Sequence, residues 1–161
     1  TWMRCNRKTQ ALGVYLPATS LGTRVDAAVA IDTSGSMSTE MLTDLLGEVK
    51  GIMEQFTDFR LHIWCFDTEV HNPYVFTPDN LNDILEYDIQ GGGGTDFECN
   101  WEFMKENDIL PERFIMMTDG MPCGGWGEES YCDTTFLIHS DPNHRIQSPF
   151  GMTVYYDDAA A

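Results

Sequence analysis

Two apolar runs, at residues 25–31 and 113–117, are almost continuous, and each ends in a polar turn. Short continuous runs of this kind are typical of strands buried on both faces of a sheet. Other stretches of alternating or β-branched and aromatic residues are of comparable length and are also bounded by turn residues. The pattern predicts strands at residues 25–31, 60–66, 69–76, 113–117, 134–138 and 152–156.

Helical spacing appears between the strands. Ser38 or Thr39 can cap a helix, and Glu40 lies where the positive end of the helix dipole favours an acid. Apolar residues then recur every three or four positions and define one face. The members of this face are Met41, Leu45, Val49, Ile52 and Phe56. A second helix is predicted at residues 97–106 and a short one at residues 81–85.

Strands that alternate with helices predict an α/β fold, a Rossmann-like doubly wound and mostly parallel sheet with helices on both faces. Pro73 interrupts the strand at residues 69–76 and therefore places it at an edge of the sheet. The connections from Asp119 to Thr134 and from Ser140 to Met152 lack a helical period. The later half is therefore expected to be a trimmed version of this architecture.

The chain has 161 residues, enough for one well-packed domain. We expect residues 1–24 to be a lead-in that packs on the domain edge, and residues 25–161 to form the domain. The start at Thr1 without a Met indicates an excised fragment, so an upstream domain is expected.

Charge narrows the class of partner. Nine Lys and Arg against 26 Asp and Glu give 9 − 26 = −17. Nucleic acid and anionic membranes need a cationic surface, so this balance argues against both and favours divalent cations and a basic partner. Five cysteines without a disulfide-scaffold spacing, and no signal-like segment, predict a cytoplasmic location.

Polar turns with oxygen donors follow the buried strands. Asp32, Ser34 and Ser36 come directly after the first strand, around Gly35, and Asp119 follows the strand at residues 113–117. Thr95 and Asp96 follow four consecutive glycines, residues 91–94, and open a predicted helix. Ligands of such sheets bind at the carboxyl ends of the strands, so these segments are expected to meet at one edge. Hard divalent cations prefer oxygen ligands, which predicts a metal site there.

These residues resemble the metal-ion-dependent adhesion site of von Willebrand factor A (VWA) domains. The resemblance covers about residues 25–156 and implies a VWA-like fold with one antiparallel edge strand. It also implies a set of roles. Ser34, Ser36 and Thr95 would bind the cation through their hydroxyls, and Asp32 and Asp119 directly or through water. Asp96 would orient the hydroxyls from the second shell. The cation would be Mg2+, with Mn2+ or Ca2+ as alternatives.

In that family a carboxylate from a partner protein completes the coordination, so the cation acts as a bridge. Glycines beside the site let a partner approach closely. Trp126 lies on a glycine-rich loop behind Asp119, where it could contact a partner or fold back onto the core. The residues expected to contact a partner are Gly35, Gly93, Gly94, Gly120 and Trp126.

The segments around Trp2, Arg4, Arg7 and Tyr15 to Pro17 resemble a bacterial and phage group of VWA-like proteins. Longer members carry an N-terminal metallopeptidase-like domain and are often linked with AAA+ ATPases. Two functions follow. One is a non-enzymatic, Mg2+-dependent protein-interaction domain, possible partners being an AAA+ ATPase or another domain of the parent protein. The other is a regulatory domain of a larger AAA+-associated peptidase or metal chelatase, whose catalytic part lies outside this chain.

Other chemistry has less support. A zinc peptidase needs a spacing such as His-Glu-x-x-His, which the four histidines do not provide. A metallohydrolase acting alone would have only Asp96 as a candidate base. Cys65 and Cys99 are expected to be core residues rather than activated thiolates. A structural zinc site is an alternative that lacks the usual tight Cys-x-x-Cys pair, with Cys123, Cys132, His139 and His144 as its ligands.

Overall fold

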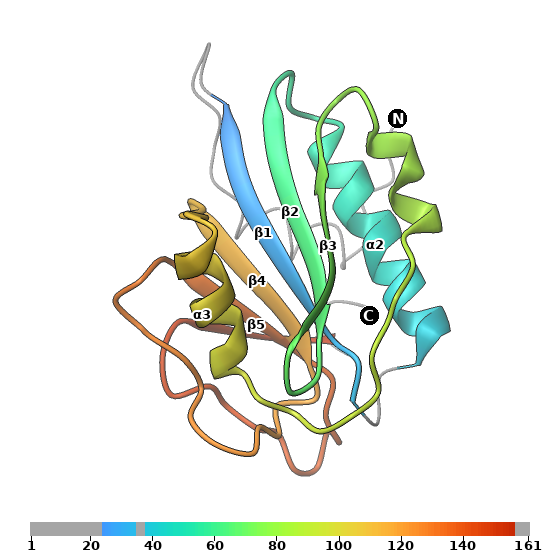
Figure 1. Ribbon diagram of the computed structural model, residues 1–161. Coiled ribbons are helices and arrows are strands. Elements are labelled where there is room, and N and C mark those ends of the chain that lie inside the picture. The colour runs from blue at the N-terminus through green and yellow to red at the C-terminus, as the bar shows by residue number, and fades with distance from the viewer. Residues whose placement is uncertain (1–23, 35–37, 157–161) are drawn as a thin grey trace.

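The computed structural model describes residues 24–34 and 38–156, which form a single six-stranded sheet with helices on both faces (Figure 1). The strand order is β3-β2-β1-β4-β5-β6. The strands are β1 (Val25–Asp32), β2 (Phe59–Phe66), β3 (Val70–Phe76), β4 (Arg113–Thr118), β5 (Thr134–Ile138) and β6 (Met152–Tyr155).

Neighbouring strands are parallel except at one edge. β1 pairs in parallel with β2 on one side and with β4 on the other, and β4, β5 and β6 continue in parallel. β3 pairs antiparallel with β2 and ends the sheet. This confirms the mostly parallel sheet and the antiparallel edge strand. The carboxyl ends of β1, β2, β4 and β5 therefore lie at one edge.

Side-chain alternation divides the core into two layers. Ala27, Val29 and Ile31 of β1 belong to the layer under helix α2 (Thr39–Met53) and the 3-10 helix η1 (Leu81–Glu86). Ala28 and Ala30 face the other layer, under helix α3 (Glu98–Glu106). Figure 1 shows α2 and α3 on opposite sides of the sheet. Because both faces of β1 are covered, its sequence is an almost continuous run of apolar residues.

Helix α2 begins where the sequence predicts it. The Ser38 hydroxyl accepts a hydrogen bond of 3.1 Å from the Met41 backbone N–H, one of the amides that a helix start leaves without a partner. The apolar face that follows is buried, including Leu42, Leu45 and Val49. Packing of this face on the sheet holds the helix beside the carboxyl end of β1.

The later half lacks helices in its connections, as predicted. The segments between β4 and β5 and between β5 and β6 are irregular. Their side chains replace a helix on the α3 face, where Trp126, Tyr131 and Phe150 pack against the core. Phe136 of β5 is a neighbour of two of them, with ring centroids 5.2 Å from Trp126 and 5.4 Å from Phe150.

The remaining predictions differ from the structure only at element boundaries. β2 begins at Phe59 and α3 at Glu98, one residue from each predicted start. The lead-in prediction concerns residues 1–24, and all of these except Arg24 lie outside the described residues. Within the described part of the chain, no helix is long and apolar enough to cross a membrane.

Candidate metal centre

Asp32 lies at the centre of the predicted site. It is the last residue of β1, and its side chain is fully buried. Its Oδ1 accepts hydrogen bonds from the backbone N–H of Ser34 at 2.9 Å and from the Ser34 hydroxyl at 2.6 Å. Its Oδ2 accepts a hydrogen bond of 2.6 Å from the hydroxyl of Thr118, the last residue of β4. One carboxylate thus joins the ends of two neighbouring strands.

Thr95 reaches the same place from a distant part of the chain. Its hydroxyl donates a hydrogen bond of 2.6 Å to Ser34 Oγ. The two residues are 8% exposed (Ser34) and 6% exposed (Thr95). The structure therefore brings Asp32, Ser34 and Thr95 together, as the sequence predicts, and their binding of a metal remains a prediction.

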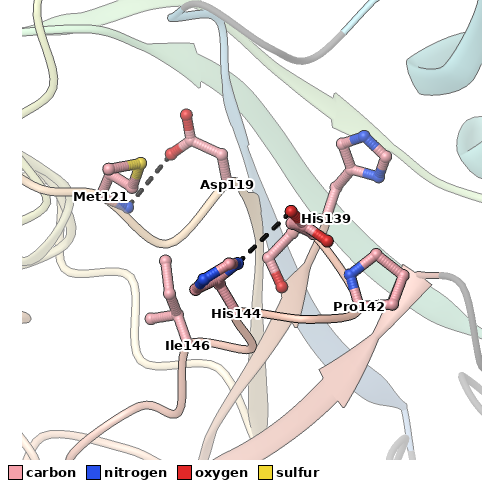
Figure 2. Close-up of a pocket in the computed structure, with 8 residues that line it drawn as sticks. Asp119, Met121, His139, Pro142, His144 and Ile146 are labelled. Carbon is pink, nitrogen blue, oxygen red and sulfur yellow. Dashed lines mark hydrogen bonds and ion pairs between the residues drawn. The ribbon is translucent and has the colours of Figure 1, made fainter.

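Asp119 follows Thr118 directly and completes the group of acids at this edge. It is half-buried, and its Oδ1 accepts a hydrogen bond of 3.1 Å from the Met121 backbone N–H (Figure 2). The turn is held from inside, because the Gly120 backbone N–H donates to Thr118 Oγ1 at 3.1 Å. The same Thr118 hydroxyl donates to Asp32, so the turn that carries Asp119 is coupled to the buried carboxylate.

Electrostatics at this edge favour a cation. Burial raises the pKa of Asp32 above its ordinary value of 3.8, although hydrogen bonds from Ser34 and Thr118 oppose the shift, and the charge of Asp119 raises it further. An ionised Asp32 is therefore incompletely compensated by the protein itself. A divalent cation beside both carboxylates would stabilise their ionised forms, and its binding would release a proton wherever Asp32 is protonated.

The donor set fits a hard cation. All donors are carboxylate or hydroxyl oxygens, which suit Mg2+, Mn2+ or Ca2+ better than zinc or copper. Among the described residues, no three His, Cys, Asp or Glu side chains form a group that could hold a metal ion. The candidate centre has only two carboxylates, and its other donors are hydroxyls, so it is not a group of that kind.

The same observation contradicts the alternative of a structural zinc site. Cys123, Cys132, His139 and His144 all belong to the described residues, and they do not come together as a metal-binding group. Burial also raises the pKa of the Cys132 thiol to about 11. The physical reason is placement: Cys132 packs near β5, whereas Cys123 is exposed in the loop after β4.

For three predicted site residues the structure does not show the expected role. Ser36 and Gly35 lie outside the described residues. Asp96 is described, and its Oδ1 accepts a hydrogen bond of 3.0 Å from the Glu98 backbone N–H at the start of α3. The hydroxyls of Ser34 and Thr95 donate to Asp32 and to Ser34, respectively, so the expected orienting role of Asp96 remains a prediction.

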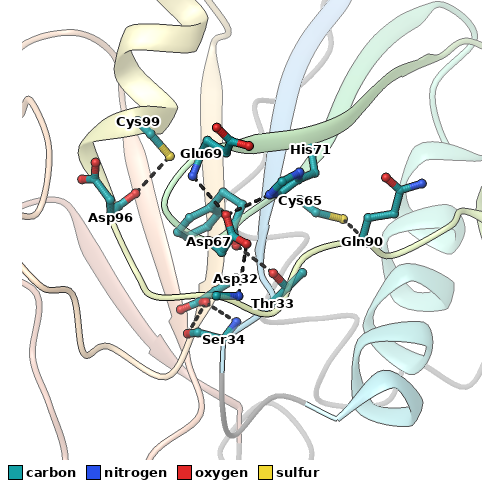
Figure 3. Close-up of polar contacts among 12 residues, drawn as sticks. Asp32, Thr33, Ser34, Cys65, Asp67, Glu69, His71, Gln90, Asp96 and Cys99 are labelled. Atoms are coloured by element: carbon teal, nitrogen blue, oxygen red, sulfur yellow. Dashed lines mark hydrogen bonds and ion pairs between the residues drawn. The ribbon is translucent and has the colours of Figure 1, made fainter.

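Asp67 is a carboxylate that the sequence reasoning missed. It follows β2 directly, much as Asp32 ends β1, and is only 8% exposed. Its Oδ1 accepts a hydrogen bond of 3.1 Å from the Glu69 backbone N–H and lies 2.8 Å from His71 Nε2, and its Oδ2 accepts one of 3.1 Å from the Gly93 N–H (Figure 3). Burial alone would raise its pKa, but these hydrogen bonds and the charge of His71 lower the pKa to about 2.

The contacts of Asp67 position the glycine loop. Its side chain holds Gly93, and its backbone carbonyl accepts a hydrogen bond of 2.8 Å from the Asp96 N–H. Thr95 lies between these two anchored residues. Asp67 therefore fixes the segment from which the Thr95 hydroxyl reaches Ser34. The sequence contained a signal for Asp67, because it lies at the end of a strand, as do Asp32 and Asp119, the two acids predicted as metal ligands.

At three positions of this loop a side chain would meet a different neighbouring residue. Gly91 has φ +129°, and a Cβ there would lie 2.2 Å from Thr33 Oγ1. A Cβ on Gly93 would lie 3.1 Å from Asp67 Oδ2, and one on Gly94 would lie 3.2 Å from Thr68 Cγ2. Both Gly93 and Gly94 are exposed, so they are accessible to a partner, whereas Gly120 is buried.

Trp126 folds back onto the core. Its ring makes edge contacts with Phe97 and Phe136, each with centroids 5.2 Å apart. The structure therefore supports core packing, the second of the two alternatives for this residue. Trp126 is only half-buried, and a partner contact through its remaining surface stays a prediction.

The buried thiols agree with a non-catalytic role. Cys65 and Cys99 are core residues, as predicted. Burial raises the pKa of both thiols, that of Cys99 to about 12 with a further contribution from Asp96. A thiol with so high a pKa is protonated at neutral pH and is a weak nucleophile.

Comparison with known proteins agrees with this fold. No curated protein matches the sequence. Among solved structures, the conserved hypothetical protein BatB from Bacteroides thetaiotaomicron is similar at a TM-score of 0.57 and 14% identity, over 74% of this chain and 68% of that one. The ArnB paralog VWA2 from Sulfolobus acidocaldarius has a TM-score of 0.54 and 14% identity, over 84% of this chain and 37% of that one.

Likeness at this level of identity shows the fold alone. A family model provides stronger evidence: the model described as VWA-like domain (DUF2201) matches residues 27–157, which include all strands and helices of the described structure except the first two residues of β1. The chain therefore belongs to the VWA-like domain family DUF2201.

Proposed function

We propose that this chain is a divalent-cation-dependent protein-interaction domain in which Mg2+ docks a carboxylate of a partner protein. The observation that carries the proposal is the meeting of Asp32, Ser34 and Thr95 through hydrogen bonds of 2.6 Å at the carboxyl edge of the sheet, beside Asp119. Oxygen donors from three separate segments converge there.

The chemistry of the donors supports an outside ligand. Mg2+ takes six oxygen ligands and is commonly held by one or two protein carboxylates. Asp32 and Asp119 supply two carboxylates, and the hydroxyls of Ser34 and Thr95 supply neutral donors. Ligand positions thus remain for water or for a carboxylate from another protein, and a carboxylate there would bring favourable charge to the cation.

The surroundings support docking rather than enclosed catalysis. Exposed glycines precede Thr95, and Met121 beside Asp119 is 65% exposed. A macromolecule can therefore approach this edge. The expected partner is a protein with an accessible Asp or Glu. An AAA+ ATPase, or another domain of a larger metal-dependent enzyme that this chain regulates, remains the specific proposal from the resemblance.

The test is capture of partners from a lysate of the source cells, in Mg2+ and in EDTA. Asp32→Asn removes a ligand charge, and Asp79→Asn is the matched control, because Asp79 is exposed and follows β3, at the opposite edge of the sheet. We expect capture by the wild type and Asp79→Asn in Mg2+ only, and none by Asp32→Asn. Equal capture in EDTA, or by Asp32→Asn, would contradict the proposal.

A further inference from the structure

A groove of about 580 Å3 opens beside Asp119 (Figure 2). One wall is the turn after β4, and the other is the segment that follows β5. It adjoins the candidate metal centre through Asp119 itself. It is lined by Asp119, Met121, Asp141, Pro142, His144 and Ile146, and His139 and Ser140 complete the lining.

The two walls are packed together, so the groove has a fixed position relative to the centre. Gly120 has φ +80°, a conformation that favours glycine. A Cβ there would lie 3.2 Å from Ile146 Cγ2 and 3.3 Å from Ile138 Cγ2. The turn that carries Asp119 thus touches the segment that carries the far wall. This contact, together with the burial of Gly120, gives the residue a structural reason to be glycine.

The lining combines an apolar wall with an acidic rim. Met121, Pro142 and Ile146 present hydrocarbon surface, and methionine adapts its shape readily to a ligand. On the rim, Asp141 has a side chain that is 58% exposed. Its Oδ1 accepts a hydrogen bond of 2.9 Å from the Asn143 N–H, and its Oδ2 lies 3.5 Å from His144 Nδ1. The Asp141 carboxylate is therefore oriented by its own loop and accessible to solvent.

A lysine or arginine side chain matches this combination. Its methylene stem can lie on apolar surface while its charged end stays in water or beside a carboxylate. An acidic side chain in the groove would face Asp119 and Asp141, and a neutral aliphatic one would gain nothing from the rim. The net charge of −17 adds a long-range attraction for cationic segments.

We propose that this groove binds a Lys or Arg side chain of the same partner segment whose carboxylate binds the metal. The inference rests on the proposed function, because the metal places the segment over the groove. The recognised partner would then carry an acidic residue with a basic residue close to it in sequence. The metal would provide the anchor, and the groove would select among acidic segments.

The test uses short blocked peptides that contain one Glu and, at one of the neighbouring positions, Lys, norleucine or a second Glu. Binding is measured by NMR titration at pH 8, where histidine side chains are ordinarily neutral. Asp141→Asn keeps the acceptor for the Asn143 N–H and removes the charge. Asp79→Asn, at the opposite edge, has the same change in charge and is the matched control.

We expect the Lys peptide to bind the wild type and Asp79→Asn about fivefold more tightly than the norleucine peptide. This ratio corresponds to the free energy of an exposed ion pair. Asp141→Asn should abolish this preference without changing Mg2+ affinity. If every peptide needs Mg2+ but none shows a Lys preference, the groove proposal is wrong and the docking proposal stands. If no peptide needs Mg2+, both are overturned.

Discussion

At the scale of single residues, Asp32 shows a conflict between stability and binding. It is fully buried, and burial raises its pKa above 3.8 despite three accepted hydrogen bonds. A buried carboxylate with a raised pKa destabilises the folded state when it is ionised. The residue is therefore costly for folding, and a cation would offset that cost. This is the pattern expected of a binding residue rather than a structural one.

Asp32→Asn should thus be at least as stable as the wild type in EDTA at neutral pH. The folded state holds the Asp32 proton to a higher pH than the unfolded state does. The Asp32 contribution to stability therefore falls as pH rises from 3.8 through the raised pKa. The stability advantage of Asp32→Asn should grow over that interval and then level off. Urea unfolding at several pH values measures it, and a large loss of stability at pH 7 would contradict this account.

Asp67 should behave in the opposite way. Its pKa is lowered from 3.8 to about 2, which corresponds to about 2 kcal/mol of stability above pH 4. Asp67→Asn should lose most of that stability at neutral pH. The difference from the wild type should shrink as pH falls from 3.8 towards 2, where the wild-type carboxyl takes up its proton. Urea unfolding measures this difference in stability. A difference that does not change with pH would show that the charge of Asp67 does not contribute to stability.

At the scale of elements, the sequence predicted the strands and the long helix to within a few residues. The reason is physical: β1 and β4 are covered on both faces, and α2 has one buried face and a Ser38 cap, so burial leaves a clear periodic pattern. The pattern of apolar and polar residues says less about the conformation of the glycine loop, residues 91–94. Its conformation depends on Asp67, which is 26 positions from Gly93, and a contact over that separation leaves no periodic signal.

Gly91 and Gly92 provide a matched test of that loop. Both have a φ near +130°, so alanine is strained at either position, by roughly 1–3 kcal/mol. Only at Gly91 would the new Cβ collide with Thr33, whose neighbours are Asp32 and Ser34; at Gly92 it meets nothing within 4 Å. Gly91→Ala should therefore weaken Mg2+ binding about tenfold or more, as changes to groups that orient ligands commonly do. Gly92→Ala should bind Mg2+ like the wild type.

Calorimetric titration of both variants measures the difference. Their circular dichroism spectra should match that of the wild type, so that lost binding cannot be attributed to unfolding. Equal Mg2+ affinity in the two alanine variants would show that contact between the glycine loop and Thr33 does not shape the centre.

At the scale of the whole molecule, the fold converts separate strand ends into one site. Asp32 and Thr118 end neighbouring parallel strands, so their side chains meet without any special loop. The sequence could predict this convergence because parallel order places carboxyl ends together. It could not predict the groove beside Asp119, since irregular connections such as the one after β5 carry no period from which to place Asp141 or Ile146.

Cation binding should also stabilise the whole domain. At a Mg2+ concentration about 100 times the dissociation constant, linkage adds about 2.7 kcal/mol, which raises the melting temperature by roughly 5 to 10 °C. A chain with a net charge of −17 also gains stability from salt alone. The comparison is therefore made against NaCl of equal ionic strength. An equal gain in NaCl, or in Asp32→Asn with Mg2+, would contradict specific binding.

The most direct measurement is an NMR titration of the isotope-labelled chain with Mg2+, followed at each backbone amide, in the wild type and Asp32→Asn. The account predicts saturable shifts centred on Ser34, Thr95 and the turn at Asp119 in the wild type, and none there in Asp32→Asn. Shifts spread over the many surface acids, or identical shifts in the two proteins, would contradict a metal centre at the carboxyl ends of β1 and β4.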